Sequence, residues 1–174
     1  MNIYQFNLQF SPEEDRIVFK LNTFNKEEFR FYLTRRFVKV LWPVLQQLMS
    51  NDLRRREPEK SHVAQAVLEF EHEKVLSQTN FTQKYSEEVT TYPLGEELIL
   101  LFGIRVKQAP QGDILCLHNS AGKGIEFMVN NAFLHPFCKL LAENLIRAEW
   151  ELNFPSAPQK AQTETVQPSP KVLH

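Results

Sequence analysis

The first 33 residues alternate between apolar and polar side chains in three short stretches, 4–10, 17–21 and 29–33. Polar segments at 11–15 and 22–26 separate these stretches. An alternation with a period of two is typical of strands that bury one face, and short polar segments between them are typical of turns. The pattern therefore predicts a three-stranded antiparallel meander at the start of the chain.

A helix is predicted directly after the third strand. Thr34 is a suitable N-cap residue, and Pro58 marks the end of the helix. The apolar residues between them recur at the spacing of one helix face, and they are Phe37, Leu41, Val44, Leu45 and Leu48. Val38, Trp42 and Met49 lie to one side of that face, so we expect the helix to be buried on more than one side.

The middle of the chain is more polar than the segments on either side of it. A second helix is predicted from a cap at Ser61 to residue 77, with only a thin apolar stripe. Residues 78–95 show no periodicity and include the turn-forming segment 93–95. They are predicted to form a mobile connector.

The second half of the chain repeats the plan of the first half. Strands are predicted over 98–106, 114–118 and 125–129, and Asn130 is the N-cap of a further amphipathic helix. The apolar residues of that helix are Phe133, Phe137, Leu140, Leu141 and Leu145. The shared order of elements makes the two halves a candidate internal duplication.

We therefore expect an α+β fold with two β-β-β-α halves, residues 1–57 and 96–152, within one domain that spans 1–154. The long helices should pack on two antiparallel sheets or on one continuous sheet, with the helix and connector of 58–95 between the halves. The tail 155–174 is rich in Pro, Gln, Ser and Thr, and it is predicted to be disordered.

Composition and charge narrow the class of protein. Apolar residues make up 43% of the chain, and the formal net charge of -1 gives no overall attraction to nucleic acid or to membranes. The sequence shows neither a signal peptide nor an uncharged apolar run long enough to span a bilayer. Two cysteines do not make a disulfide scaffold. We therefore expect a cytoplasmic protein that does not contact a membrane.

Cys116, His118, His135 and Cys138 are the residue types that bind zinc tetrahedrally. Their spacings, C-x-H and H-x2-C, are not common in zinc sites. When the second predicted half is aligned with the first, apolar residues of the first half occupy the positions of Cys116, His118 and Cys138. These apolar residues are predicted to lie in the core. We therefore interpret the cysteines as buried core residues and expect no metal ion and no other cofactor.

Basic residues gather on the first predicted helix. The free backbone amides at the start of a helix already favour anions, so an anionic partner such as a nucleic-acid phosphate or a protein carboxylate is expected there. The candidate binding residues are Arg35, Arg36, Lys39, Arg54, Arg55 and Arg56. The alternative is a solvated rim with a charged helix end, which binds nothing.

Val38, Trp42 and Met49 are the candidate interface residues of a homodimer. One helix can turn only one apolar stripe onto its own sheet, and these three residues lie outside that stripe. A second copy of the chain would cover them. The alternative is that the helix predicted over 61–77 covers them within the same chain.

At the level of topology, two meander-plus-helix repeats resemble the Pur-type and Whirly-type folds. The resemblance implies binding of single-stranded nucleic acid on the sheets. The predicted strand faces here carry mainly Phe and Leu, whereas a base-stacking platform needs basic residues mixed with aromatic ones.

The sequence contains no catalytic motif and no nucleotide-binding loop. The first hypothesis is therefore a non-enzymatic protein-interaction module that forms a homodimer and binds another protein. The alternative is a nucleic-acid-binding protein that uses the basic residues of the first helix. A small metal-dependent or hydrolytic enzyme is the third hypothesis.

Overall fold

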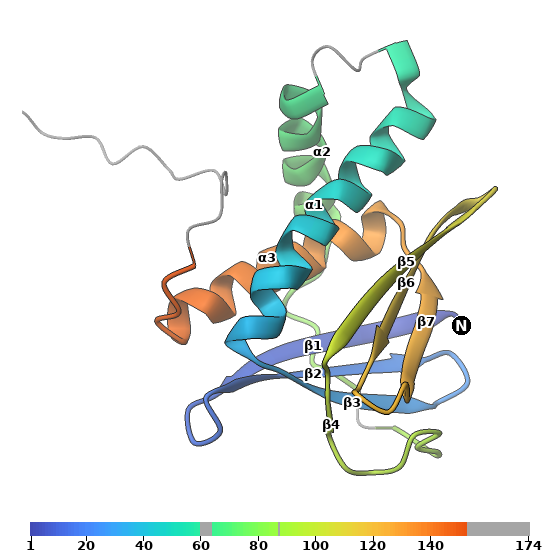
Figure 1. The fold of residues 1–174 in the computed structure, drawn as a ribbon. Helices are drawn as coiled ribbons and strands as arrows, with labels where there is room; N and C mark the ends of the chain where they lie inside the picture. The colour runs from blue at the N-terminus through green and yellow to red at the C-terminus, as the bar shows by residue number, and fades with distance from the viewer. Residues whose placement is uncertain (60–63, 87, 153–174) are drawn as a thin grey trace, which may run out of the picture.

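The computed structural model describes residues 1–59, 64–86 and 88–152. Three N-terminal strands and a short strand from the second half form a four-stranded sheet. The order in this first sheet is β1-β2-β3-β4 (Figure 1). The first three strands pair antiparallel, whereas β4 pairs parallel to β3. The strands are β1 (Ile3–Ser11), β2 (Arg16–Thr23), β3 (Glu28–Leu33) and β4 (Ile99–Leu100).

The second sheet is an antiparallel meander of three strands, β5 (Gly103–Ala109), β6 (Gly112–His118) and β7 (Gly124–Met128). The run 98–106, which the sequence predicts as one strand, is divided between the two sheets. Its beginning forms β4, and Gly103 begins β5. The prediction of one strand was wrong because a continuous apolar run carries no signal for a change of sheet.

Three helices complete the described fold, α1 (Arg35–Arg56), α2 (Ala64–Gln78) and α3 (Asn131–Arg147). Two of the three predicted N-caps, Thr34 and Asn130, are confirmed. The Thr34 hydroxyl accepts a hydrogen bond from the Phe37 amide at 3.1 Å, and the Asn130 side chain accepts one from the Phe133 amide at 3.0 Å. The predicted cap at Ser61 and the predicted tail lie outside the described residues.

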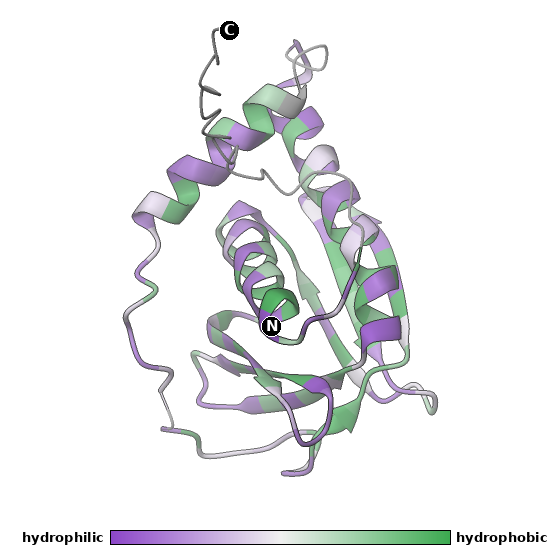
Figure 2. Ribbon diagram, turned by 90° about the vertical axis from the view of Figure 1, so that its left-hand side faces the viewer, coloured by the Kyte–Doolittle hydropathy of each residue, from purple (hydrophilic) through white to green (hydrophobic). Residues whose placement is uncertain are grey.

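The α+β fold class is confirmed. The order β-β-β-α occurs in β1 to α1 and again in β5 to α3, although the second half also contains β4. The internal duplication itself stays a prediction. The long connector leaves the end of α2 and runs round to the first sheet (Figure 2). Among the described residues, no helix combines the length and the apolar character that crossing a bilayer requires.

Each long helix packs against the sheet of the other half. α3 lies on β1, and its Phe137 ring packs edge-to-face on Phe19 of β2 at 5.2 Å between centroids. α1 instead packs against α2, α3 and the strand β6 (Figure 1). One continuous apolar cluster therefore includes residues of both halves.

An aspartate in the first hairpin of each half fixes the far end of the crossing helix. Trp150, just after α3, donates a hydrogen bond from Nε1 to Asp15 at 2.9 Å. Arg55, near the end of α1, forms an ion pair at 3.0 Å with Asp113, whose side chain is 1% exposed. These polar contacts set where each helix ends over the other half.

Val38, Trp42 and Met49 are buried within the single chain, with 0%, 4% and 6% of their surface exposed. The premise that these side chains need cover from a second copy is therefore wrong. The packing of α2 and α3 against α1 shows the physical reason, because a helix between several elements buries more than one face. The homodimer itself stays a prediction.

Replacement of Arg55 by alanine should lower the free energy of unfolding by about 2 kcal/mol, because it leaves the buried Asp113 carboxylate without its ion-pair partner. Arg54→Ala is the matched control, since Arg54 is exposed on the same turn and should change the value by less than about 0.5 kcal/mol. Urea unfolding measures the free energy of unfolding of both variants. Equal effects of the two variants would contradict this anchoring.

Candidate functional site

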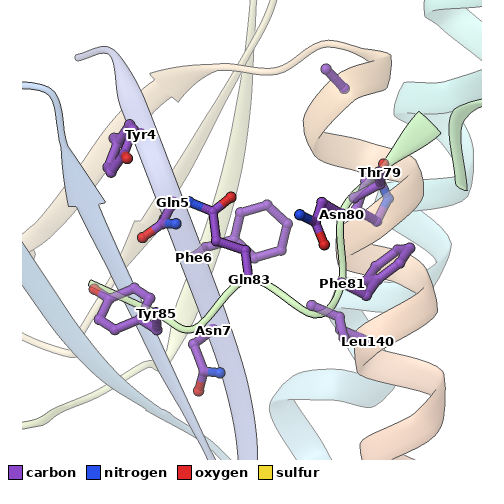
Figure 3. Close-up of a pocket in the computed structure, with 12 residues that line it drawn as sticks. Tyr4, Gln5, Phe6, Asn7, Thr79, Asn80, Phe81, Gln83, Tyr85 and Leu140 are labelled. Atoms are coloured by element: carbon purple, nitrogen blue, oxygen red, sulfur yellow. The ribbon is translucent and has the colours of Figure 1, made fainter. Parts of the chain in front are cut away.

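A groove of about 320 Å³ lies between β1, the segment that follows α2, and one face of α3 (Figure 3). Residues 4–7 of β1 form one wall, and residues of the segment 79–85 form the opposite wall. Ala132, Pro136 and Leu140 recur every four residues along α3 and line the groove from that helix.

Asn144 of α3 fixes β1 beside the groove. Its side-chain oxygen accepts a hydrogen bond from the Phe10 amide at 2.7 Å, and its side-chain nitrogen donates to the Leu8 carbonyl at 3.2 Å. Asn144 is 2% exposed, so this amide satisfies main-chain groups that would otherwise be buried without partners. The side chain takes the place that a neighbouring strand would have at this part of β1.

The main chain of Phe6 faces the same open edge of β1. Successive residues of a strand direct their N–H and C=O groups alternately to its two sides. The main-chain groups of Phe6 therefore face the same side as those of Leu8 and Phe10. β1 pairs only with β2 in the first sheet, and Asn144 does not extend beyond Leu8 toward Phe6. Within the described residues, no side chain or loop amide bonds to the Phe6 main chain. The edge is therefore open where it borders the groove.

The connector that forms the second wall is anchored to the outer face of the first sheet. The Ser86 amide donates to the Gln5 side chain at 2.9 Å, and Asn22 donates to the Ser86 carbonyl at 3.1 Å. Next to it, the Tyr85 hydroxyl donates to Glu28 at 2.9 Å. The segment predicted as a mobile connector is thus held to the sheet at the position where it borders the groove.

The groove is lined by aromatic, amide and small side chains, and none of its described lining residues carries a charge. Among the lining residues that the structure describes, Tyr4 and Tyr85 are the only titratable groups. Burial, together with the hydrogen bond to Glu28, raises the pKa of Tyr85, so this phenol is neutral near pH 7. Without a charged or readily titrating side chain, the lining offers binding contacts and no acid–base group.

An exposed aromatic pair lies at the β1 side of the groove. Tyr4 contacts Phe24 edge-to-face with 5.0 Å between the ring centroids, and the two residues are 47% and 69% exposed. Phe6 is different, because its ring packs on Phe133 and Phe137 of α3. Solvent-exposed aromatic rings next to an open strand edge are typical of surfaces that bind other proteins.

The structure separates the six predicted basic binding residues into two sets. Arg35, Arg36 and Lys39 lie at the start of α1, whereas Arg54, Arg55 and Arg56 lie at its end. The axial rise of a helix puts ~30 Å between the two sets. They do not form one patch.

Two of the arginines at the end of α1 are engaged in ion pairs. Arg55 contacts Asp113, and Arg56 makes a two-pronged contact with Glu71 of α2 at 2.8 and 2.9 Å. The hydrogen bonds from Arg56 lower the pKa of Glu71, so this pair stays ionised at neutral pH. Arg36 and Lys39 are exposed at the other end of α1.

The four residues considered as zinc ligands lie on two different elements. Cys116 and His118 lie on the face of β6 opposite to the core residues Leu115 and Leu117, while His135 and Cys138 lie in α3. The described part of the chain contains no group of three or more His, Cys, Asp or Glu side chains arranged for a metal ion. Burial raises the pKa of the Cys138 thiol to about 12, so this thiol is protonated at neutral pH.

No family model matches this chain. No curated protein matches it either. A search of the solved structures likewise finds no match. The functional conclusions therefore rest on the geometry of this fold.

Replacement of Asn144 by alanine should lower the free energy of unfolding by about 2–3 kcal/mol, because the Leu8 carbonyl and the Phe10 amide lose their partner. Gln47→Ala is the control, since Gln47 is an exposed helical amide whose partner is Asn51. Thermal unfolding measures the melting temperatures of both variants and of the wild type. A melting temperature of Asn144→Ala equal to that of the wild type would show that the clamp on β1 is dispensable.

Proposed function

We propose that this protein is a non-enzymatic interaction module that binds an extended, uncharged peptide segment of another protein in the groove beside β1. The observation that carries the proposal is the open main chain of Phe6 next to a groove lined by uncharged aromatic and amide side chains. Such an edge binds a peptide by adding it to the sheet as a further strand.

The clamp by Asn144 defines where the added strand would stop. A peptide pairs with the main chain at Phe6 and meets the Asn144 side chain at Leu8. The wall from Tyr4 to Asn7 is ~10 Å long at the usual rise of a strand, which accommodates about three or four peptide residues. A contact of this size buries far less than a standard protein interface, so we expect micromolar affinity.

The chemistry of the lining selects the class of peptide. A charged side chain that enters the groove would lose water and meet no opposite charge among the described lining residues. The amides of Gln5, Asn7, Asn80 and Gln83 can instead donate to or accept from the peptide main chain. The exposed rings of Tyr4 and Phe24 add an apolar contact at one end.

The hypothesis of nucleic-acid binding by α1 has less support from the geometry. The six basic residues are divided between the two helix ends, and Arg55 and Arg56 are already paired with carboxylates. A phosphate chain would therefore meet only the three cations at the start of α1, which is a small share of the contacts that nucleic-acid binding usually requires.

Selection from a library of immobilised eight-residue peptides tests the proposal. The selected peptides should be uncharged in their central residues, and Ala132→Glu should weaken their binding at least tenfold because it places a carboxylate in the groove. Ala66→Glu is the matched control, since Ala66 is an exposed helical alanine outside the groove. Isothermal titration with the selected peptides measures both variants.

Two results would refute the groove as the binding site. One is a library that yields no binder at all. The other is a set of selected peptides that bind wild type and Ala132→Glu equally well, because such peptides must bind elsewhere. Amide chemical shifts provide an independent check, since the Phe6 amide should shift on addition of a peptide.

A further inference from the structure

Polar side chains join α2 to the two long helices. Glu71 of α2 binds Arg56 of α1 and also accepts a hydrogen bond from Asn131 of α3 at 3.3 Å. Next to Glu71, the Nδ1 atom of His72 lies 3.0 Å from the Nδ1 atom of His135 in α3. We call this group of five residues the helix junction.

The apolar and polar residues of α2 are not separated into two clear faces. The helix has seven apolar and eight polar residues, and hydrophobic and hydrophilic positions alternate along it (Figure 2). Its Leu68 packs against the core as a partly buried residue, whereas its largest apolar residue, Phe70, is 68% exposed. The polar contacts of the helix junction therefore add to a limited apolar contact of α2 with the core.

The surroundings of His135 determine which ring atoms carry hydrogen. His135 is 0% exposed, and its buried Nε2 has no hydrogen-bond partner among the described residues. A hydrogen on Nε2 would be an orphaned buried donor, which folded proteins avoid. The hydrogen therefore belongs on Nδ1 of His135, which donates to a bare Nδ1 on His72. His72 is half-buried and carries its own hydrogen on Nε2.

An added proton is unfavourable wherever it binds. On Nδ1 of His72 it either sets two N–H groups against each other or moves the hydrogen of His135 to Nε2, where that hydrogen has no partner among the described residues. On Nε2 of His135 it places a charge with an orphaned donor in the core. Asp52 and Arg56 of α1, Glu71 and Glu73 of α2, and Lys139 of α3 are the charged groups that face the pair. Glu71 is engaged by Arg56, whose positive charge opposes a further cation.

We propose that the contact between His72 and His135 is a pH-sensitive latch, which keeps α2 docked at neutral pH and releases it as the solution becomes acidic. The function of the latch rests on the proposed function of the groove. α2 leads directly into the wall of the groove that begins at Thr79, and Pro136, next to His135, lines the groove from α3. Release of α2 removes this wall and weakens peptide binding.

The direction of the effect follows from the proton balance. Burial is the main cause that lowers the pKa of both histidines, and it lowers the pKa of His135 from 6.5 to about 4. The released state therefore binds more protons than the docked state between these two values. Docking is unaffected above pH 6.5 and weakens as the pH falls below it. At pH 5, His135 alone reduces the docking equilibrium by up to about 30-fold, the limit that applies when release of α2 exposes its ring fully to water.

Hydrogen exchange of the full chain at pH 7.5 and pH 5.0, corrected for intrinsic rates, tests the latch. The protection of α2 amides relative to α3 amides should fall at the lower pH, with a contribution of up to about 30-fold from His135. His135→Leu should reduce this fall, because the variant keeps only one titrating ring of the pair, that of His72. His118→Gln is the control, since His118 lies on β6 away from the junction, and it should show the same fall as wild type.

Constant relative protection of wild-type α2 at the two pH values would overturn the latch. An undiminished fall in His135→Leu would overturn it as well, because another group would then be responsible. If His135→Leu does not fold, His72→Gln is tested in its place. This variant has one titrating ring fewer than wild type, so the relative protection of α2 should fall less at pH 5.0. A fall in His72→Gln as large as in wild type would equally contradict the proposal.

The affinity of a selected uncharged peptide at both pH values separates the latch from the groove. Wild type should bind the peptide more weakly at pH 5.0, and His135→Leu should show a smaller loss of affinity between the two pH values. Exchange that changes with pH while peptide affinity stays constant would overturn the coupling to the groove. Absence of any peptide binder, with exchange behaving as expected, would overturn the proposed function and leave the latch in place.

Discussion

The fold depends on a crossed arrangement in which each long helix packs over the sheet of the other half. α3 lies on the first sheet, and α1 reaches the strand β6 of the second sheet. The Trp150 hydrogen bond to Asp15 and the Arg55 ion pair with Asp113 fix the helix ends. A sheet must bury its apolar face against another element. Because that element comes here from the other half, the two halves form one core.

The groove is a consequence of this crossing. α3 brings the Asn144 amide to the edge of β1. One face of the same helix also lines the groove beside this strand. Native proteins normally protect a strand edge, because unpaired main-chain groups attract other chains. Asn144 protects the edge at Leu8 and Phe10 but not at Phe6. The connector encloses the unprotected part, and the helix junction holds α2, from which the connector begins.

Local features were predictable from the sequence, and long-range side-chain pairs were not. The alternation of strand residues and the caps Thr34 and Asn130 depend only on neighbouring residues. The strands β1 to β3 and the starts of α1 and α3 were therefore predicted correctly. Asn144 accepts a hydrogen bond from Phe10, which is 134 positions away in the sequence, and His72 contacts His135, which is 63 positions away. The hydrophobic periodicity of the sequence does not indicate which distant residues form such pairs. The separation of the basic residues into two sets was within reach of the sequence. A helix that ends at Arg54–Arg56 and begins at Arg35 is about six turns long, which keeps its two ends apart.

Separate expression of the fragments 1–59 and 64–152 tests the crossed packing most directly. Neither fragment should unfold cooperatively alone, because the sheet of the first fragment then lacks α3 and the second fragment lacks α1. Mixing the fragments should restore a one-to-one complex with a cooperative thermal transition, followed by circular dichroism. A cooperative transition in fragment 1–59 alone would contradict the account, since α1 would then suffice to cover the sheet of its own half.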